Sequence, residues 1–221
     1  MQKILKSSEV KNPSTQKFEA SWWLEILMFP VIAVGRTLFY LLVQSARRIK
    51  SNEHLFPYRR TGESPAIYVY WNSKSLYLIP DLSGARIKYF TFYDLKHWVI
   101  QKIAGMPDSQ RLVFISKERA FFQLVRALKT GESVCLAVDG PYDEPGKLKE
   151  GAAAVSWRTQ YPLIATQVEV DRSFRLSWRW DKFEIGWPFA KVKITPTYHD
   201  PKTAESFESY CCNIEKALGN P

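Results

Sequence analysis

The chain has 221 residues, of which 46% are hydrophobic and 24% charged. This balance suits one globular domain with a sizeable core and excludes general disorder. The formal charge of +9 attracts polyanions, either nucleic acid or anionic lipid headgroups. No zinc-ligand spacing and no RNA-binding signature is present, so the sequence predicts neither a metal site nor a bound cofactor. An aromatic-rich, apolar stretch near the N-terminus favours lipid over nucleic acid.

That stretch, Trp22–Val43, follows a basic segment and is interrupted by Glu25, Pro30 and Arg36. As a helix it would extend roughly 33 Å, about the thickness of a bilayer's hydrocarbon core. It could span the membrane, lie in the interface as a kinked helix, or pack in the core. We expect a membrane-embedded or interfacial anchor. Residues 1–52 therefore form a basic segment with a membrane-associated helix, and residues 53–221 form a separate α/β domain.

Beyond Glu53, apolar runs of strand length alternate with amphipathic stretches of helical spacing. This alternation predicts an α/β fold with a mixed, mostly parallel sheet flanked by helices. The expected strands are Pro65–Trp71, Ile87–Phe92, Arg111–Ile115, Val134–Val138, Leu163–Val170, Arg175–Trp180 and Val192–Thr195. The expected helices are Asp94–Ala104, Glu118–Thr130, Ala152–Gln160 and Ala204–Leu218.

Three polar residues stand just after predicted strands: Asn72, Asp94 and Asp139. Ligands of open α/β sheets bind beyond the carboxyl ends of the strands, so all three are site candidates. Each also has a structural explanation. Asn72 could cap the following helix, Asp94 is a good N-cap, and Asp139 begins an Asp-Gly-Pro turn.

The segment LAVDGPYDEPGKLKEGAAAVSWRTQYPLIATQVEV and the preceding block LVFISKERAFFQLVRALKTGESV carry a resemblance. They resemble the lysophospholipid acyltransferase-like superfamily, most closely a bacterial branch in which a strand ends in Asp-Gly-Pro. The resemblance extends over about Ile67 to Pro196. The matching positions are Asp139, Gly140, Pro141, Gly151, Pro162 and Ile164.

The resemblance implies a glycerolipid-acyltransferase fold in which a His follows the first strand, often with an Asp five residues later. That His deprotonates an acceptor hydroxyl, which attacks an acyl thioester of coenzyme A or an acyl carrier protein. Asn72 occupies the His place here and Tyr77 the Asp place. An amide cannot accept a proton usefully near neutral pH.

From their places after predicted strands, together with the resemblance at Asn72 and Asp139, we expect catalytic roles for Asn72, Asp139 and Asp94. The residues expected to bind substrate are Ser73, Lys74, Lys117, Arg119, Gly140 and Pro141. Lys117 and Arg119, with Lys147 and Lys149, would suit a phosphate group, although they could equally be solvated surface charge. No spacing rule selects a substitute base among Lys74, the two aspartates and the histidines His54, His97 and His199.

Two functions therefore remain open. The chain is an acyltransferase-related protein that transfers or binds an acyl chain on a lipid-like hydroxyl acceptor at the membrane. Alternatively, it is a catalytically inactive homologue that binds lipid or a partner protein. Cys135, Cys211 and Cys212 form no disulfide framework, which indicates reduced thiols in the cytosol. We expect membrane association at the cytoplasmic face, in bacteria the inner membrane, with anionic headgroups and an acyl carrier protein as partners. The oligomeric state stays open.

Overall fold

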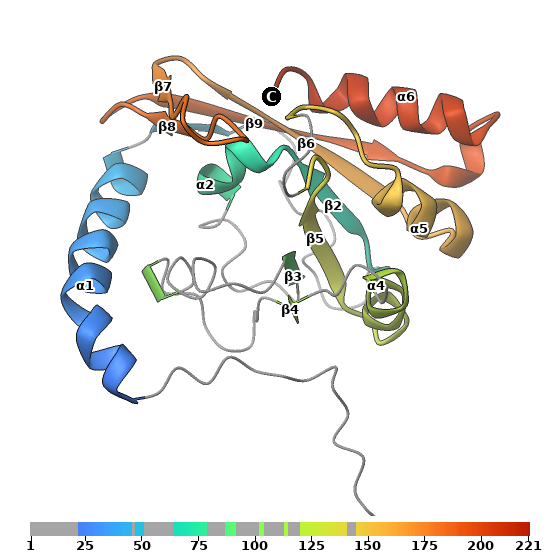
Figure 1. The fold of residues 1–221 in the computed structure, drawn as a ribbon. Helices are drawn as coiled ribbons and strands as arrows, with labels where there is room; N and C mark the ends of the chain where they lie inside the picture. Colours follow the sequence, from blue (N-terminus) through green and yellow to red (C-terminus); the bar gives the residue numbers. More distant parts are fainter. Residues whose placement is uncertain are drawn as a thin grey trace, which may run out of the picture.

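A seven-stranded sheet forms the centre of the protein in the computed structural model (Figure 1). The structure describes residues 22–45, 47–50, 64–78, 87–91, 102–103, 113–114, 120–140 and 145–221. The strand order is β1-β9-β6-β2-β5-β3-β4, and every neighbouring pair is parallel except β6 with β9. The strands are β1 Arg47–Lys50, β2 Ile67–Tyr70, β3 Ile87–Thr91, β4 Val113–Phe114, β5 Ser133–Ala137, β6 Leu163–Val170 and β9 Lys191–His199. The predicted mixed, mostly parallel sheet is confirmed.

Helices cover this sheet, and a small hairpin extends from it. The helices are α1 Trp22–Ser45, η3 Asn72–Lys74, α2 Ser75–Leu78, α4 Ala120–Lys129, α5 Gly151–Thr159, η6 Pro201–Thr203 and α6 Phe207–Leu218. The hairpin pairs β7, Ser173–Arg175, with β8, Glu184–Gly186, in antiparallel fashion. In Figure 1, α1 lies on the opposite side of the molecule from α4, α5 and α6.

The core has two layers, one on each face of the sheet. Successive side chains of a strand point to opposite faces, so Ile67 and Val69 of β2 pack with α4, α5 and α6. Tyr68 and Tyr70 pack in the other layer, which includes Tyr77 of α2. Because β2 is covered on both faces, all four of its residues are buried.

The loop after β7 departs from the sequence prediction. A strand was expected over Arg175–Trp180, but β7 ends at Arg175 and the chain then turns. The N–H of Arg179 donates to the carbonyl of Leu176 at 3.0 Å, and the N–H of Leu176 donates to Phe183 at 2.9 Å. These bonds close a tight loop in place of a longer strand. The expected helix over Asp94–Ala104 lies outside the described residues, except that residues 102 and 103 are helical.

The N-terminal segment contributes both a helix and a strand. α1 runs without a break through Pro30, and its large side chains from Ile26 to Leu41 are mostly exposed. Within the described part of the chain, no helix has the length and apolarity to cross a membrane. β1 lies inside the predicted N-terminal segment yet pairs in parallel with β9. The division of the chain at residue 52 stays a prediction.

Candidate functional site

Asn72 lies at the carboxyl end of β2, where the chain leaves the sheet and enters η3. It is the first residue of η3, and Trp71 occupies the N-cap position without a side-chain cap. The amide of Asn72 is therefore not a helix cap, which corrects that interpretation of the sequence. Its side-chain Nδ2 donates to Oδ2 of Asp181 at 2.7 Å, and its backbone N–H donates to Oδ1 of Asp139 at 2.9 Å. Asn72 therefore donates hydrogen bonds to the carboxylates of both Asp139 and Asp181.

Asp139 follows β5, the parallel neighbour of β2. The register pairs Tyr70 with Ala137, the last residues of β2 and β5, so the two strands end side by side at the same edge of the sheet. Asp139 is buried, and besides the Asn72 N–H its carboxylate accepts the N–H of Gly146 at 3.5 Å. Burial raises the pKa of Asp139, while these two backbone donors act in the opposite direction. Its described contacts brace the loop after β5 against the end of β2.

Asp181 was not among the residues that the sequence selected. It lies in the loop between β7 and β8, and its side chain is fully buried. Arg179 binds it with two hydrogen bonds, from Nε to Oδ1 at 2.8 Å and from Nη2 to Oδ2 at 2.6 Å. These bonds raise the pKa of Arg179 and fix the carboxylate that receives the Asn72 amide.

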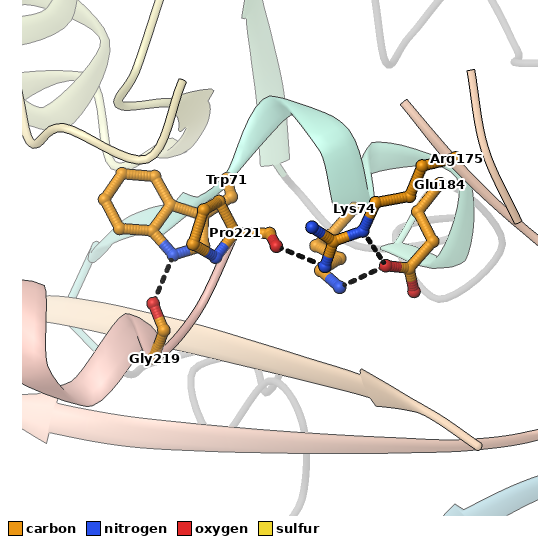
Figure 2. A network of polar contacts seen from close by, with 6 residues as sticks. All are labelled: Trp71, Lys74, Arg175, Glu184, Gly219 and Pro221. Atoms are coloured by element: carbon orange, nitrogen blue, oxygen red, sulfur yellow. Dashed lines mark hydrogen bonds and ion pairs between the residues drawn. The ribbon is translucent and has the colours of Figure 1, made fainter. Parts of the chain in front are cut away.

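A second buried ion pair lies one turn further on (Figure 2). Lys74 Nζ lies 2.8 Å from Glu184 Oε2, and both side chains are less than a tenth exposed. Arg175 reaches the same oxygen at 3.2 Å from the solvent side and also donates to the carbonyl of Pro221 at 2.6 Å. A buried ammonium requires a partner acid, and Glu184 is that partner, although no sequence pattern indicated that Lys74 is buried. That Lys74 binds substrate stays a prediction.

Trp71 fixes the base of this turn from the other side (Figure 2). Its ring is buried, and its Nε1 donates to the carbonyl of Gly219 at 2.8 Å, just after α6. Residues 71 to 74 are therefore held by the sheet, by the β7–β8 hairpin and by the segment after α6. This turn is rigidly placed by contacts with three distant parts of the chain.

The remaining candidates are only partly described. Ser73 is buried and its hydroxyl has no hydrogen-bond partner in the structure. Lys149 is exposed and lies over Gly140, where an added Cβ would meet its Nζ at 3.5 Å. The predictions for Asp94, Lys117, Arg119 and Pro141 fall outside the described residues, as do those for His54 and His97. No group of metal-ligating side chains occurs in the described part.

The chemistry open to Asn72 is hydrogen bonding. Nδ2 donates to Asp181, and the carbonyl Oδ1 is the side-chain atom that can accept a hydrogen bond from a hydroxyl. His199, the one histidine in the described part, lies on β9 and packs its ring against Tyr210 of α6. Burial lowers the pKa of His199. Its described ring contact belongs to the sheet–helix interface.

Comparison with known proteins identifies the fold. No family model matches the chain. The cation transporter HKT1;1 of Oryza sativa subsp. japonica is 25% identical over 128 residues, which cover 56% of this chain and 22% of that protein. Such a short match assigns no family.

A solved structure is similar over most of the chain. It is that of PlsC, the 1-acyl-sn-glycerophosphate (LPA) acyltransferase from Thermotoga maritima, with a TM-score of 0.55 and 18% identity. The similarity covers 88% of this chain and 77% of that chain. The predicted fold of the glycerolipid-acyltransferase type is thereby confirmed.

Proposed function

We propose that this protein is an acyltransferase-related lipid-binding protein that holds a lipid hydroxyl beside Asn72 at a membrane and transfers acyl chains weakly or not at all. One observation carries the proposal. The second residue after β2 is an asparagine whose Nδ2 donates a hydrogen bond to Asp181 at 2.7 Å. The likeness to PlsC supports the fold, and the name of that protein suggests the class of ligand, a glycerolipid with a free hydroxyl.

The weak transfer follows from the chemistry of the amide. The sequence resemblance implies a His at position 72, and a general base typically contributes about 10²–10⁴ in rate. Asn72 cannot take up the proton of an attacking hydroxyl, but its Oδ1 can accept a hydrogen bond from it. Binding and orientation of the acceptor do not depend on an imidazole. We therefore assign Asn72 to binding rather than to proton transfer.

Among the described residues, the titratable groups nearest to Asn72 are already engaged in buried interactions. Both carboxylate oxygens of Asp139 accept backbone N–H groups, and its raised pKa reflects burial rather than an unpaired site. Lys74 is bound to Glu184 at 2.8 Å. Asp181 is held by Arg179 through two hydrogen bonds. Each of these groups already takes part in a buried interaction, and proton uptake by either carboxylate would weaken it.

The headgroup would be bound by cations at the edge of the sheet. A phosphate requires donors beside the hydroxyl site, and Lys149 lies over Gly140, directly after Asp139. Lys147 belongs to the same loop and is also exposed. We infer that this loop receives the phosphate of the lipid, and that an acyl thioester of coenzyme A or acyl carrier protein is the co-substrate of any residual transfer.

Membrane association is the second half of the proposal. α1 exposes large apolar side chains along its length, including Phe29 at 70% and Leu27 at 65%. Such a surface is unfavourable in water and suits the boundary of a bilayer. We propose that α1 lies in the interface at the cytoplasmic face, with residues 53–221 as the lipid-binding domain.

Lipid binding and transfer test the proposal together. We expect the purified full chain to bind a lysophospholipid with a phosphate headgroup, measured by titration calorimetry, while showing little transfer from acyl-coenzyme A. Lys149→Glu should weaken binding about tenfold, since it reverses a charge at the phosphate. Lys202→Glu is the matched control, an equally charged change at an exposed lysine of η6, and should bind normally. Absence of binding by the unmodified chain would overturn the proposal.

A further inference from the structure

The β7–β8 hairpin and the chain up to β9 expose an unusual number of aromatic rings. Phe174 is 40% exposed, Trp178 78%, Trp187 56% and Phe189 63%. The rings of Phe174 and Trp187 pack against each other at 5.4 Å between centroids. Large exposed aromatic side chains close together in the chain can mark interaction sites, because they cost free energy in water. We refer to these four residues as the hairpin patch.

The exposed charges around the hairpin patch are mostly basic, and Asp171, beside Arg172, is the exposed acid that adjoins them. Within residues 172–191 the two acidic side chains, Asp181 and Glu184, are buried in the ion pairs of the site. The exposed charged residues of the same stretch are all basic: Arg172, Arg175, Lys182 and Lys191. Exposed tryptophan and phenylalanine interleaved with basic side chains match the chemistry of an anionic bilayer surface, where rings enter the interface and cations meet phosphates.

The backbone conformation of Phe189 indicates that its exposed ring has a role beyond folding. Its φ is +65°, a left-handed conformation that is costly for a bulky residue. Its carbonyl accepts a hydrogen bond from Arg172 Nη2 at 3.3 Å, which helps to hold the backbone in this conformation. Glycine would adopt this conformation without strain. An exposed aromatic ring kept in a strained position points to a role outside the fold.

The hairpin patch lies at the same corner of the sheet as the end of α1. β1 begins two residues after α1, and its Arg47 pairs with Lys191 at the start of β9. Phe189 stands two residues before Lys191 in the chain. The register of these two strands therefore brings the C-terminal end of α1 to the same end of the sheet as Phe189.

We propose that the hairpin patch is a second membrane contact, which inserts its rings into the interface of an anionic bilayer beside α1. The inference rests on the proposed function and deepens it. Trp178 is three residues from Asp181, the partner of the Asn72 amide. Docking of the hairpin would bring the end of β2 to the bilayer surface, where an acceptor lipid could reach Asn72 without leaving the membrane.

Two single variants of the full chain test this inference by co-sedimentation with vesicles. The vesicles contain equal parts of phosphatidylglycerol and phosphatidylcholine, or phosphatidylcholine alone. Trp178→Ala and Phe189→Gly should each bind the anionic vesicles about tenfold more weakly, since each removes a large ring from the interface. Phe122→Ala is the matched control. It removes a ring that is 72% exposed on α4, and it should bind like the unmodified chain.

The outcomes separate the inference from the proposed function. Phe189→Gly relieves a strained backbone, so it should melt at or above the temperature of the unmodified chain, and its weaker binding cannot then be attributed to unfolding. Unchanged binding of both variants would overturn the hairpin contact and leave the proposed function standing. Equal binding to phosphatidylcholine alone would overturn the role of the basic residues. Failure of the unmodified chain to bind either vesicle would refute both.

Discussion

Large aromatic side chains occur both at the centre of the sheet and in the β7–β8 hairpin, but they are buried in the first region and exposed in the second. At the end of β2, Tyr68, Tyr70 and Trp71 are at most 5% exposed and pack on both faces of the sheet. In the hairpin, Trp178 and Trp187 are more than half exposed. Within the hairpin, the acidic side chains are buried against the turn after β2, whereas the exposed rings face solvent.

This contrast separates the residues that hold the site from those that could bring a ligand to it. The turn that carries Asn72 is held by buried hydrogen bonds and ion pairs, which specify one geometry at the cost of desolvation. The exposed rings contribute little to that geometry. We therefore expect substitutions in the first group to reduce stability and those in the second group to leave the fold intact.

The largest effect should come from paired tryptophan substitutions. Trp71→Ala removes a buried ring and its hydrogen bond to Gly219, and should lower the free energy of unfolding by about 3–5 kcal/mol. Trp178→Ala removes an exposed ring and should change it by less than about 0.5 kcal/mol. Urea denaturation followed by circular dichroism measures both. Similar losses of unfolding free energy in the two variants would contradict the difference between the buried turn and the exposed hairpin.

A smaller effect is expected when an ion pair of the site is removed. Lys74→Ala leaves the buried Glu184 with Arg175 as its remaining partner, and should cost about 3 kcal/mol. Lys193→Ala is the control, since its pair with Glu169 is about half exposed on both sides and should cost less than about 1 kcal/mol. Chemical denaturation of both variants gives the difference. A Lys74→Ala variant of nearly unchanged stability would show that the ion pair with Glu184 does not stabilise the turn.

Asp139 should give the next effect and a dependence on pH. Asp139→Ala removes an acceptor for two backbone N–H groups and should cost about 2 kcal/mol. Since the pKa of Asp139 is raised in the folded state, the folded protein binds this proton more tightly than the unfolded chain. Its contribution to stability is therefore complete below about pH 4 and is lost as the pH rises through the raised value.

Asp139→Asn should remove this dependence while keeping an oxygen for the Asn72 N–H. The stability of the unmodified protein relative to Asp139→Asn should fall as the pH rises above about 4. Thermal melts at a series of pH values measure it. A difference that is constant over this range would show that Asp139 does not titrate as its burial requires.

Local patterns predicted the parts of the molecule that depend on local interactions. The apolar run Leu163–Val170 is β6 with the same bounds, and the ends of β2 and β5 meet because adjacent parallel strands share an edge. Asn72 and Asp139 were therefore brought together by topology alone. The strand expected over Arg175–Trp180 was wrong in extent, because a turn stabilised by backbone bonds to Leu176 replaces most of it.

The partners of the site residues could not be predicted in the same way. Asp181 and Glu184 meet Asn72 and Lys74 across more than a hundred residues, and no spacing rule connects them. An acid beside Lys74 becomes a requirement once the structure shows that this lysine is buried. Which acid it is depends on how the hairpin folds back, and that is a property of the tertiary structure.

The most direct test of the central claim is acyl transfer by the unmodified protein and by Asn72→Ala and Asn72→His. The transfer of a radiolabelled acyl group from coenzyme A to a lysophospholipid is followed with equal amounts of each protein. We predict little transfer by the first two, and a gain with Asn72→His, because an imidazole beside Asp181 could act as a general base. Rapid transfer by the unmodified protein that persists in Asn72→Ala would contradict the account.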